Sequence, residues 1–179
     1  MIASLLPAEF KTLDGQTFTM RFATYDDVDE ICRFFDSLSL ESRRRRFFVA
    51  KPHTAPGFVA GMVGAPGAKS TCVVTTESST GMIVALGQYA GADGGSSAEV
   101  AFAVMDRLQH HGLASELLRH LAAIALEAKI DEFTALVLAE NHLMLSVFRE
   151  SGFALTTEWE HGVGTVRLAL RPAPVLTAS

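Results

Sequence analysis

The sequence contains few of the residues on which several classes of protein depend. Only two of its 179 residues are cysteine, Cys32 and Cys72, and neither belongs to a CxxC pair or a Cys/His cluster with metal-ligand spacing. The six histidines are scattered along the chain and show no ligand spacing either. We therefore expect neither a disulfide framework nor a metal site, and a reducing cytoplasmic compartment fits this composition best.

Positive charge and long apolar runs are also scarce. The 15 lysine and arginine residues face 20 aspartate and glutamate residues, which gives a net charge of -5. No dominant basic face for nucleic acid or anionic lipid is expected. The longest apolar segment, Leu117 to Leu126, is interrupted by Arg119 and His120 and is too short to span a bilayer. Residues 1–10 have no basic leader, so we expect no signal peptide.

The chain nevertheless has enough apolar sequence to build a core. It is 49% hydrophobic and 20% charged, and its length is typical of one globular domain. We expect one domain over residues 1–171 and a flexible C-terminal tail over residues 172–179.

Hydrophobic periodicity predicts a mixture of strands and helices, and the expected class is α+β. The expected strands are Thr17 to Ala23, Thr71 to Thr76, Met82 to Ala90, Glu99 to Val104, Phe133 to Leu138, Phe153 to Trp159 and Val163 to Leu170. The expected helices are Asp26 to Leu38, a short one from Ser39 to Arg46, Leu113 to Ala128 and Asn141 to Glu150, with a further short helix around Phe58 to Val63 in a loop from Pro52 to Gly67.

The segment from Val104 to Ser115 lies between an expected strand and a long expected helix. The N-terminus of a helix offers unpaired N–H groups and about half a positive charge, which suits a pyrophosphate. Gly112 would let the backbone approach such a ligand closely, and Ala114 keeps the next position but one small. The same residues also fit an ordinary strand-to-helix turn.

This segment resembles the acetyl-CoA-binding motif of GNAT acetyltransferases, Gln/Arg-x-x-Gly-x-Gly/Ala, with Gln109, Gly112 and Ala114 in register. Asn141, followed by Phe148 and the pair Gly152-Phe153, is similar to a later Asn…Gly-Phe segment of that family. The resemblance implies a GNAT fold, with a central mixed and mostly antiparallel sheet of six to seven strands flanked by about four helices.

Further stretches resemble the GNAT domain of Pat-type protein lysine acetyltransferases. They are Leu13 to Gly15 leading to Arg21, Ser39 to Ser42, Arg46 to Phe48, and Ala98 to Phe102. The resemblance extends from about Leu13 to Leu170. The larger members of that group carry a second domain that this chain does not match, so their regulation is not expected here.

The resemblance implies acetyl-CoA as the acyl donor and a set of residues that binds it. Those residues are Phe102, Val104, Met105, Gln109, His110, His111, Gly112, Leu113, Ala114, Ser115, Asn141 and Phe148. Backbone N–H groups near Val104 and Met105 are expected to bind the oxyanion. A tyrosine often protonates the leaving thiolate in this family, but Phe148 stands at the matching position and removes that acid.

A primary amine must lose a proton before it attacks, since the pKa of a lysine is about 10.4. The resemblance places a catalytic glutamate at Glu99, which can act as the base if partial burial raises its pKa. Glu99 also fits an exposed charge at the end of a strand. The run Arg43 to Arg46 similarly has two interpretations: it either steers an acidic peptide or a cofactor phosphate, or forms a solvated helix face.

The sequence therefore predicts acetyl transfer from acetyl-CoA to a primary amine, with a protein lysine favoured over a small-molecule amine. A small-molecule N-acetyltransferase is one alternative. A non-catalytic acyl-CoA-binding regulatory module is another, because Phe148 replaces a common catalytic residue. Family habit also suggests a homodimer.

Overall fold

The computed structural model describes residues 5–12, 14–49, 53–63, 69–92 and 94–171. Its strands are β1 (Ala8–Lys11), β2 (Thr17–Phe22), β3 (Ser70–Glu77), β4 (Ile83–Gly91), β5 (Ser97–Val104), β6 (Glu132–Leu138), β7 (Ala154–Glu160) and β8 (Val163–Ala169). Its helices are α1 (Val28–Ser37), α2 (Leu40–Phe47), α3 (Pro56–Met62), α4 (Leu113–Glu127) and α5 (His142–Arg149), with 3-10 turns η2 (Tyr25–Asp27) and η3 (Asp106–Leu108).

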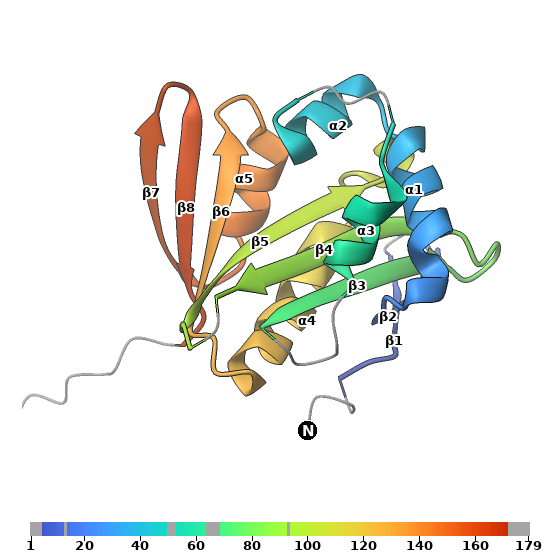
Figure 1. Ribbon diagram of the computed structural model, residues 1–179, viewed down its shortest axis with the longest axis horizontal. Helices are drawn as coiled ribbons and strands as arrows, with labels where there is room; N and C mark the ends of the chain where they lie inside the picture. Colours follow the sequence, from blue (N-terminus) through green and yellow to red (C-terminus); the bar gives the residue numbers. More distant parts are fainter. Residues whose placement is uncertain (1–4, 13, 50–52, 64–68, 93, 172–179) are drawn as a thin grey trace, which may run out of the picture.

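The strands form one sheet in the order β1-β2-β3-β4-β5-β6-β8-β7 (Figure 1). Every neighbouring pair is antiparallel except β5 and β6, which run parallel. The expected α+β class and the mixed, mostly antiparallel sheet are confirmed. The described residues contain one strand more than the sequence predicts: β1 is a four-residue edge strand whose half-buried residues alternate with exposed ones too briefly to be recognised.

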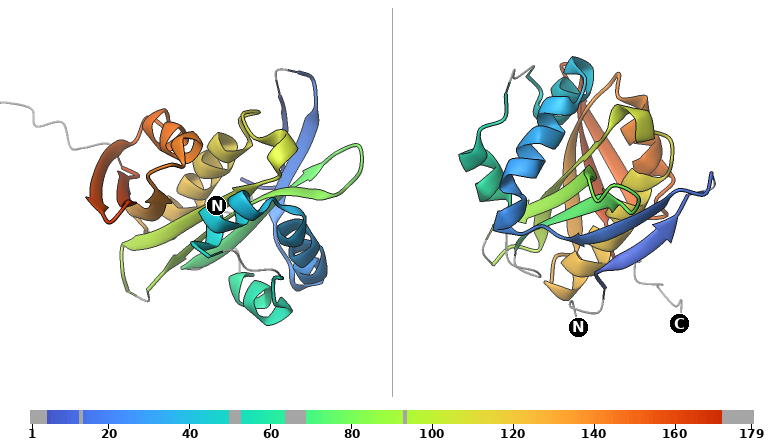
Figure 2. Two further views of the ribbon diagram at one scale, coloured as in Figure 1. Left: turned by 90° about the horizontal axis from the view of Figure 1, so that it is seen from above. Right: turned by 90° about the vertical axis from the view of Figure 1, so that its right-hand side faces the viewer.

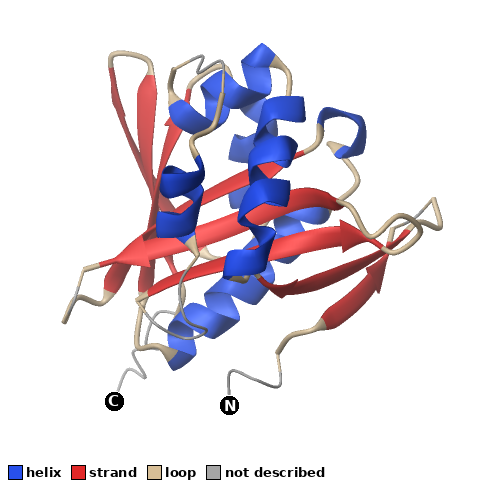
Figure 3. Cartoon of the chain, turned by 45° about the vertical axis from the view of Figure 1, so that its right-hand side comes forward, coloured by secondary structure: helices blue, strands red, loops and turns tan. Residues whose placement is uncertain are grey.

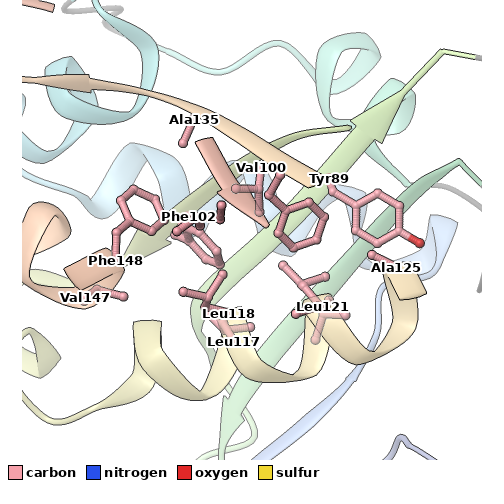
Figure 4. Close-up of a cluster of buried hydrophobic side chains, with 14 of the residues drawn as sticks. Tyr89, Val100, Phe102, Leu117, Leu118, Leu121, Ala125, Ala135, Val147 and Phe148 are labelled. Atoms are coloured by element: carbon pink, nitrogen blue, oxygen red, sulfur yellow. The ribbon is translucent and has the colours of Figure 1, made fainter. Parts of the chain in front are cut away.

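Helices cover both faces of the sheet (Figure 2). Helices α4 and α5 pack on one face, where Leu117, Leu121 and Phe148 join a core cluster with Tyr89 and Phe102 (Figure 4). Helices α1 and α3 pack on the other face, where Phe35 and Val59 belong to a second cluster. The cartoon in Figure 3 shows both helical layers with the sheet between them.

Local signals in the sequence set the limits of the helices. Ser39 caps α2, because its side-chain oxygen accepts a hydrogen bond from the Ser42 N–H group, and Asn141 caps α5 by accepting one from Met144. The expected short helix near Phe58 is present as α3. Parts of the predicted loop, residues 52 and 64–67, lie outside the described residues, as does the predicted tail 172–179. No helix in the described ranges is both long and apolar enough to cross a membrane.

One ion pair joins the sheet to the start of the first helical layer. Arg21 on β2 donates two hydrogen bonds to the buried Asp27 carboxylate, both of 2.7 Å. The Thr24 N–H group donates a third, also of 2.7 Å. The hydrogen bonds from Arg21 lower the pKa of Asp27, so this carboxylate is held in its charged form where α1 begins.

Candidate active site

The site lies where two neighbouring strands separate. β5 and β6 are paired only from Ser97 to Glu99 and from Glu132 to Thr134. Beyond these residues β5 continues to Val104 and β6 to Leu138 without pairing to each other, and Figure 1 shows the two strands diverging toward α2 and α5. The result is a wedge-shaped opening in the middle of the sheet.

Backbone groups of β5 face this opening. The Met105 N–H group donates a hydrogen bond of 2.9 Å to Val84, on the β4 side. The Ser96 carbonyl accepts one of 2.7 Å from Asp131, on the β6 side. Because backbone groups alternate along a strand, those of Val100, Phe102 and Val104 point into the opening. The Met105 N–H group is already engaged with Val84, which contradicts the expectation that it would help to bind the oxyanion.

A cavity of about 560 Å³ occupies this opening, lined by residues of β5, β6, α2, α4 and α5. Eleven of the thirteen predicted site residues lie on its wall, namely Glu99, Phe102, Val104, Gln109, His110, Gly112, Leu113, Ala114, Ser115, Asn141 and Phe148. The structure does not bring Met105 and His111 to this wall. The His111 ring instead lies against Asp14, with Nδ1 3.3 Å from the carboxylate.

The turn before α4 has the geometry of an anion site. Gly112 has φ of +85° and immediately precedes Leu113, whose side chain anchors the helix in the core. A Cβ atom at Gly112 would meet nothing within 4 Å. Within the protein the glycine is therefore required by its left-handed backbone and not by a close neighbour. The first turn of α4, with Ala114 and Ser115 on the cavity wall, presents free N–H groups beside small side chains.

Helix α2 is fastened to this turn by a carboxylate. Asp106 in η3 accepts hydrogen bonds from the Ser39 N–H group (3.0 Å) and from the hydroxyls of Ser39 and Ser42 (2.7 Å each). Gln109 donates to the Ser42 hydroxyl (3.1 Å) and to the Val104 carbonyl (3.4 Å). Burial raises the pKa of Asp106, but these hydrogen bonds lower it by more, and the net shift is downward.

Glu99 occupies the last paired position of β5, where the two strands begin to part. Its side chain is exposed, so the partial burial that the sequence argument required is absent in this structure. Glu99 lies close enough to Arg46 of α2 to interact with it electrostatically. The predicted base thus stands at the narrow end of the opening, opposite a guanidinium.

Phe148 presents an aromatic ring to the cavity where the family often has a tyrosine. It is 1% exposed, lines the cavity, and packs against Phe102 with 6.2 Å between ring centroids (Figure 4). A phenylalanine has no proton to give to a leaving thiolate. Asn141, which caps α5, also lines the cavity.

The sequence prediction missed the wall of the cavity formed by α2. Arg45 and Arg46 both line it, together with Ser42. Burial lowers the pKa of Arg46 to about 10. The arginine run was visible in the sequence, but an exposed helix face and a cavity wall have the same composition, and no local signal separates them.

Comparisons with known proteins agree with this geometry. Residues 17–154 match the family profile described as acetyltransferase (GNAT) domain. The GNAT domain of S. lividans PAT is 30% identical, with a TM-score of 0.82, and the match covers 90% of this chain and 96% of that one. A cAMP-binding acyltransferase from Mycobacterium smegmatis is 24% identical with a TM-score of 0.64, and the chain spans about half of it (99% and 52% coverage).

A third solved structure is that of yncA from Salmonella typhimurium with its cofactor acetyl-CoA. It is 17% identical with a TM-score of 0.69, covers 90% of this chain and is itself 99% covered. No curated protein sequence matches the chain.

Proposed function

The chain belongs to the GNAT acetyltransferase family and is an acetyl-CoA-dependent N-acetyltransferase, and we propose that its acceptor is a protein lysine, deprotonated by Glu99. The observation that carries the proposal is the position of Glu99 at the narrow end of the β5–β6 opening, on the wall of the cavity that also contains the Gly112 turn. Donor, acceptor and base can thus meet in one space.

The N-terminal turn of α4 would bind the pyrophosphate of acetyl-CoA, and the backbone of Val100, Phe102 and Val104 would hold the pantetheine arm and thioester. The amine nitrogen then attacks the thioester carbonyl carbon, and the new C–N bond forms as Glu99 accepts the amine proton, directly or through water. An N–H group of β5 stabilises the oxyanion. The C–S bond then breaks and CoA leaves as a thiolate.

The leaving group needs no strong acid in this scheme. An ordinary thiol has a pKa of about 8.5, so its thiolate is a far better leaving group than an amide anion. Phe148 supplies no proton, so the CoA thiolate is protonated by water after it has left. The proposal therefore predicts that the rate depends on Glu99 and not on a residue of α5.

A protein acceptor is supported by the edge of the cavity. Phe48 and Leu136 line the cavity and remain 37% and 46% exposed, and exposed apolar side chains at a site suit contact with another protein surface. The Ser39 to Ser42 and Arg46 to Phe48 segments, which resemble those of the Pat group, form or adjoin this same wall. These features favour a lysine exposed on a partner protein as the acceptor.

A small-molecule amine is the second candidate, favoured by the way α2 closes over the opening. The helix is fastened at one end by Asp106, and Arg44 forms an ion pair with Glu140, which follows β6. Both contacts hold α2 beside the cavity that it lines.

A thiol-release assay with lysine peptides and small amines tests the proposal. Turnover on peptides with little on free amines would support it, and the reverse result would select the second candidate. Two sequence predictions are retained as proposals: a cytoplasmic location and a homodimer.

A further inference from the structure

Arg46 differs from its neighbours on α2. Arg44 and Arg45 form ion pairs with the exposed carboxylates of Glu140 and Glu41. The Arg46 guanidinium instead lies over two aromatic rings, with Cζ 5.0 Å from the Phe47 centroid and 5.9 Å from that of Phe35. These cation–π contacts hold the planar group in one place without satisfying its hydrogen-bond donors.

Two of those donors have no acceptor. Nε and Nη2 of Arg46 are buried, and no group in the part of the chain that the structure describes accepts a hydrogen bond from them. Buried charged groups are normally paired, because an uncompensated charge is costly to remove from water. Glu99 interacts with Arg46 only electrostatically, so Arg46 keeps two donors for a hydrogen-bonding anion that the described residues do not provide.

The position of Arg46 indicates which substrate would bring that anion. Its electrostatic neighbours are Glu99 and Cys72. In the sheet, Cys72 on β3 lies opposite Gln88 on β4, and Gln88 lies opposite Ala101 on β5. Arg46 thus lies over the Glu99 half of β5, whereas the Gly112 turn follows Val104, roughly 16 Å further along the strand at about 3.3 Å per residue. An anion at Arg46 would belong to the acceptor and not to the phosphates of CoA.

We infer that Arg46 binds a carboxylate carried by the acceptor, so that the enzyme prefers amines with a carboxylate close to the reacting nitrogen. The inference rests on the proposed function in taking the acceptor to be an amine. An acceptor that arrives as an ammonium ion is repelled by a guanidinium beside Glu99, and a carboxylate in the same molecule offsets that repulsion. Arg45, also on the cavity wall, adds charge of the same sign. A planar guanidinium that donates hydrogen bonds to both carboxylate oxygens also fixes the acceptor's orientation.

Matched acceptors test the inference. Lysine peptides that differ only in carrying glutamate or glutamine, at each position from two before to two after the lysine, are compared by kcat/KM. Free lysine and lysinamide form a second pair, which separates a peptide side chain from a free α-carboxylate as the source. We expect at least one carboxylate acceptor to exceed its neutral partner by about tenfold or more, mainly through KM, as expected for a charge-assisted hydrogen bond.

Arginine variants provide the control. Arg46→Gln should abolish the preference by lowering kcat/KM on the carboxylate acceptors to that on their neutral partners, while the affinity for acetyl-CoA stays within about threefold of wild type. Arg33→Gln makes the same charge change at an exposed residue of α1, away from the cavity wall, and should keep the preference. A wild-type enzyme that does not discriminate within the pairs overturns the inference even if Arg46→Gln fails to fold, and so does an Arg46→Gln enzyme that still discriminates.

Binding separates this inference from the proposed function. The Glu99→Gln variant, saturated with acetyl-CoA, is titrated calorimetrically with the same peptide and amino-acid pairs. Tighter binding of carboxylate acceptors without turnover by the wild type would support the role of Arg46 and refute acetyl transfer to that acceptor. Turnover without any carboxylate preference in rate or binding would support the proposed function and refute the role of Arg46.

Discussion

The cavity has two unlike walls. The proposed donor wall is built from β5 backbone, the Gly112 turn and the first residues of α4, which are contiguous from Val100 to Ser115. The proposed acceptor wall is built from charged side chains, chiefly Arg45, Arg46 and Glu99. The first wall offers N–H groups that any sequence can supply, whereas the second depends on side-chain identity.

The two walls are also held in place differently. The donor wall is fixed by a strand-to-helix connection and by Leu113 in the core. The acceptor wall depends on contacts between distant residues: Ser39 and Asp106 are separated by 67 positions, and Arg44 and Glu140 by 96. A family can therefore keep its donor while it changes its acceptor. The predictions below test that division.

The largest effect is expected from substitution of Glu99, which should lower the rate of acetyl transfer without changing the binding of acetyl-CoA by the donor wall. Glu99→Gln should lower kcat by about two orders of magnitude, because the amine loses its base. The calorimetric affinity for acetyl-CoA should be unchanged. Glu158→Gln, on the exposed strand β7, is the matched control and should keep full activity. An unchanged rate in Glu99→Gln would remove Glu99 from the mechanism.

The buried ion pair at the start of α1 should make the stability of the fold sensitive to acid. Asp27→Asn should lower the free energy of unfolding at pH 7 by about 2 kcal/mol, since Arg21 and the Thr24 N–H group lose a charged partner. The pKa of Asp27 is lowered in the folded protein, so this stabilisation is present above the unfolded pKa of about 3.9 and is lost as the pH falls toward the folded value. Urea titrations should show a smaller difference between wild type and variant at pH 3 than at pH 7; an equal difference at both would contradict the assignment.

The donor wall is tested through its one left-handed glycine. Gly112→Ala should weaken acetyl-CoA binding by about tenfold, because a Cβ at φ of +85° costs about 1 to 2 kcal/mol and shifts the N–H groups of the turn. Gly162→Ala imposes similar strain at φ of +81° in the β7–β8 turn and should reduce stability without affecting binding. Calorimetry and thermal melts of both variants separate the two effects.

The smallest effect on stability is expected at Asp106, whose hydrogen bonds join α2 to the turn before α4. Asp106→Asn should reduce the free energy of unfolding by only about 1 kcal/mol, because Asp106 is an exposed residue whose carboxylate is only partly buried, and solvent screens its hydrogen bonds. The KM for the acceptor should rise several-fold more than the affinity for acetyl-CoA falls, since α2 carries Arg45 and Arg46. Equal changes in both would show that the walls act as one unit.

The sequence predicted most of the regular structure. In the described part of the chain, seven of the eight strands and the five helices were expected close to their observed limits. Alternating or helical apolar patterns and capping residues such as Ser39 and Asn141 are local signals that the sequence contains. Strand β1 was missed because only four residues at the sheet edge carry the pattern. The donor segment and the family were also accessible from sequence, since Gln109, Gly112 and Ala114 lie within six consecutive positions.

The sequence by itself determined the GNAT family and the segment expected to bind acetyl-CoA, which follows the strand that contains Glu99. Both could be read from the sequence because they depend on contiguous residues and on local backbone geometry. The tertiary structure decided that β6 leaves β5 after Glu99, that Asp106 holds α2 over the opening, and that Arg46 rather than Arg44 faces the cavity. These facts depend on contacts between residues far apart in the chain, whose energies arise only when the sheet and its two helical layers pack together.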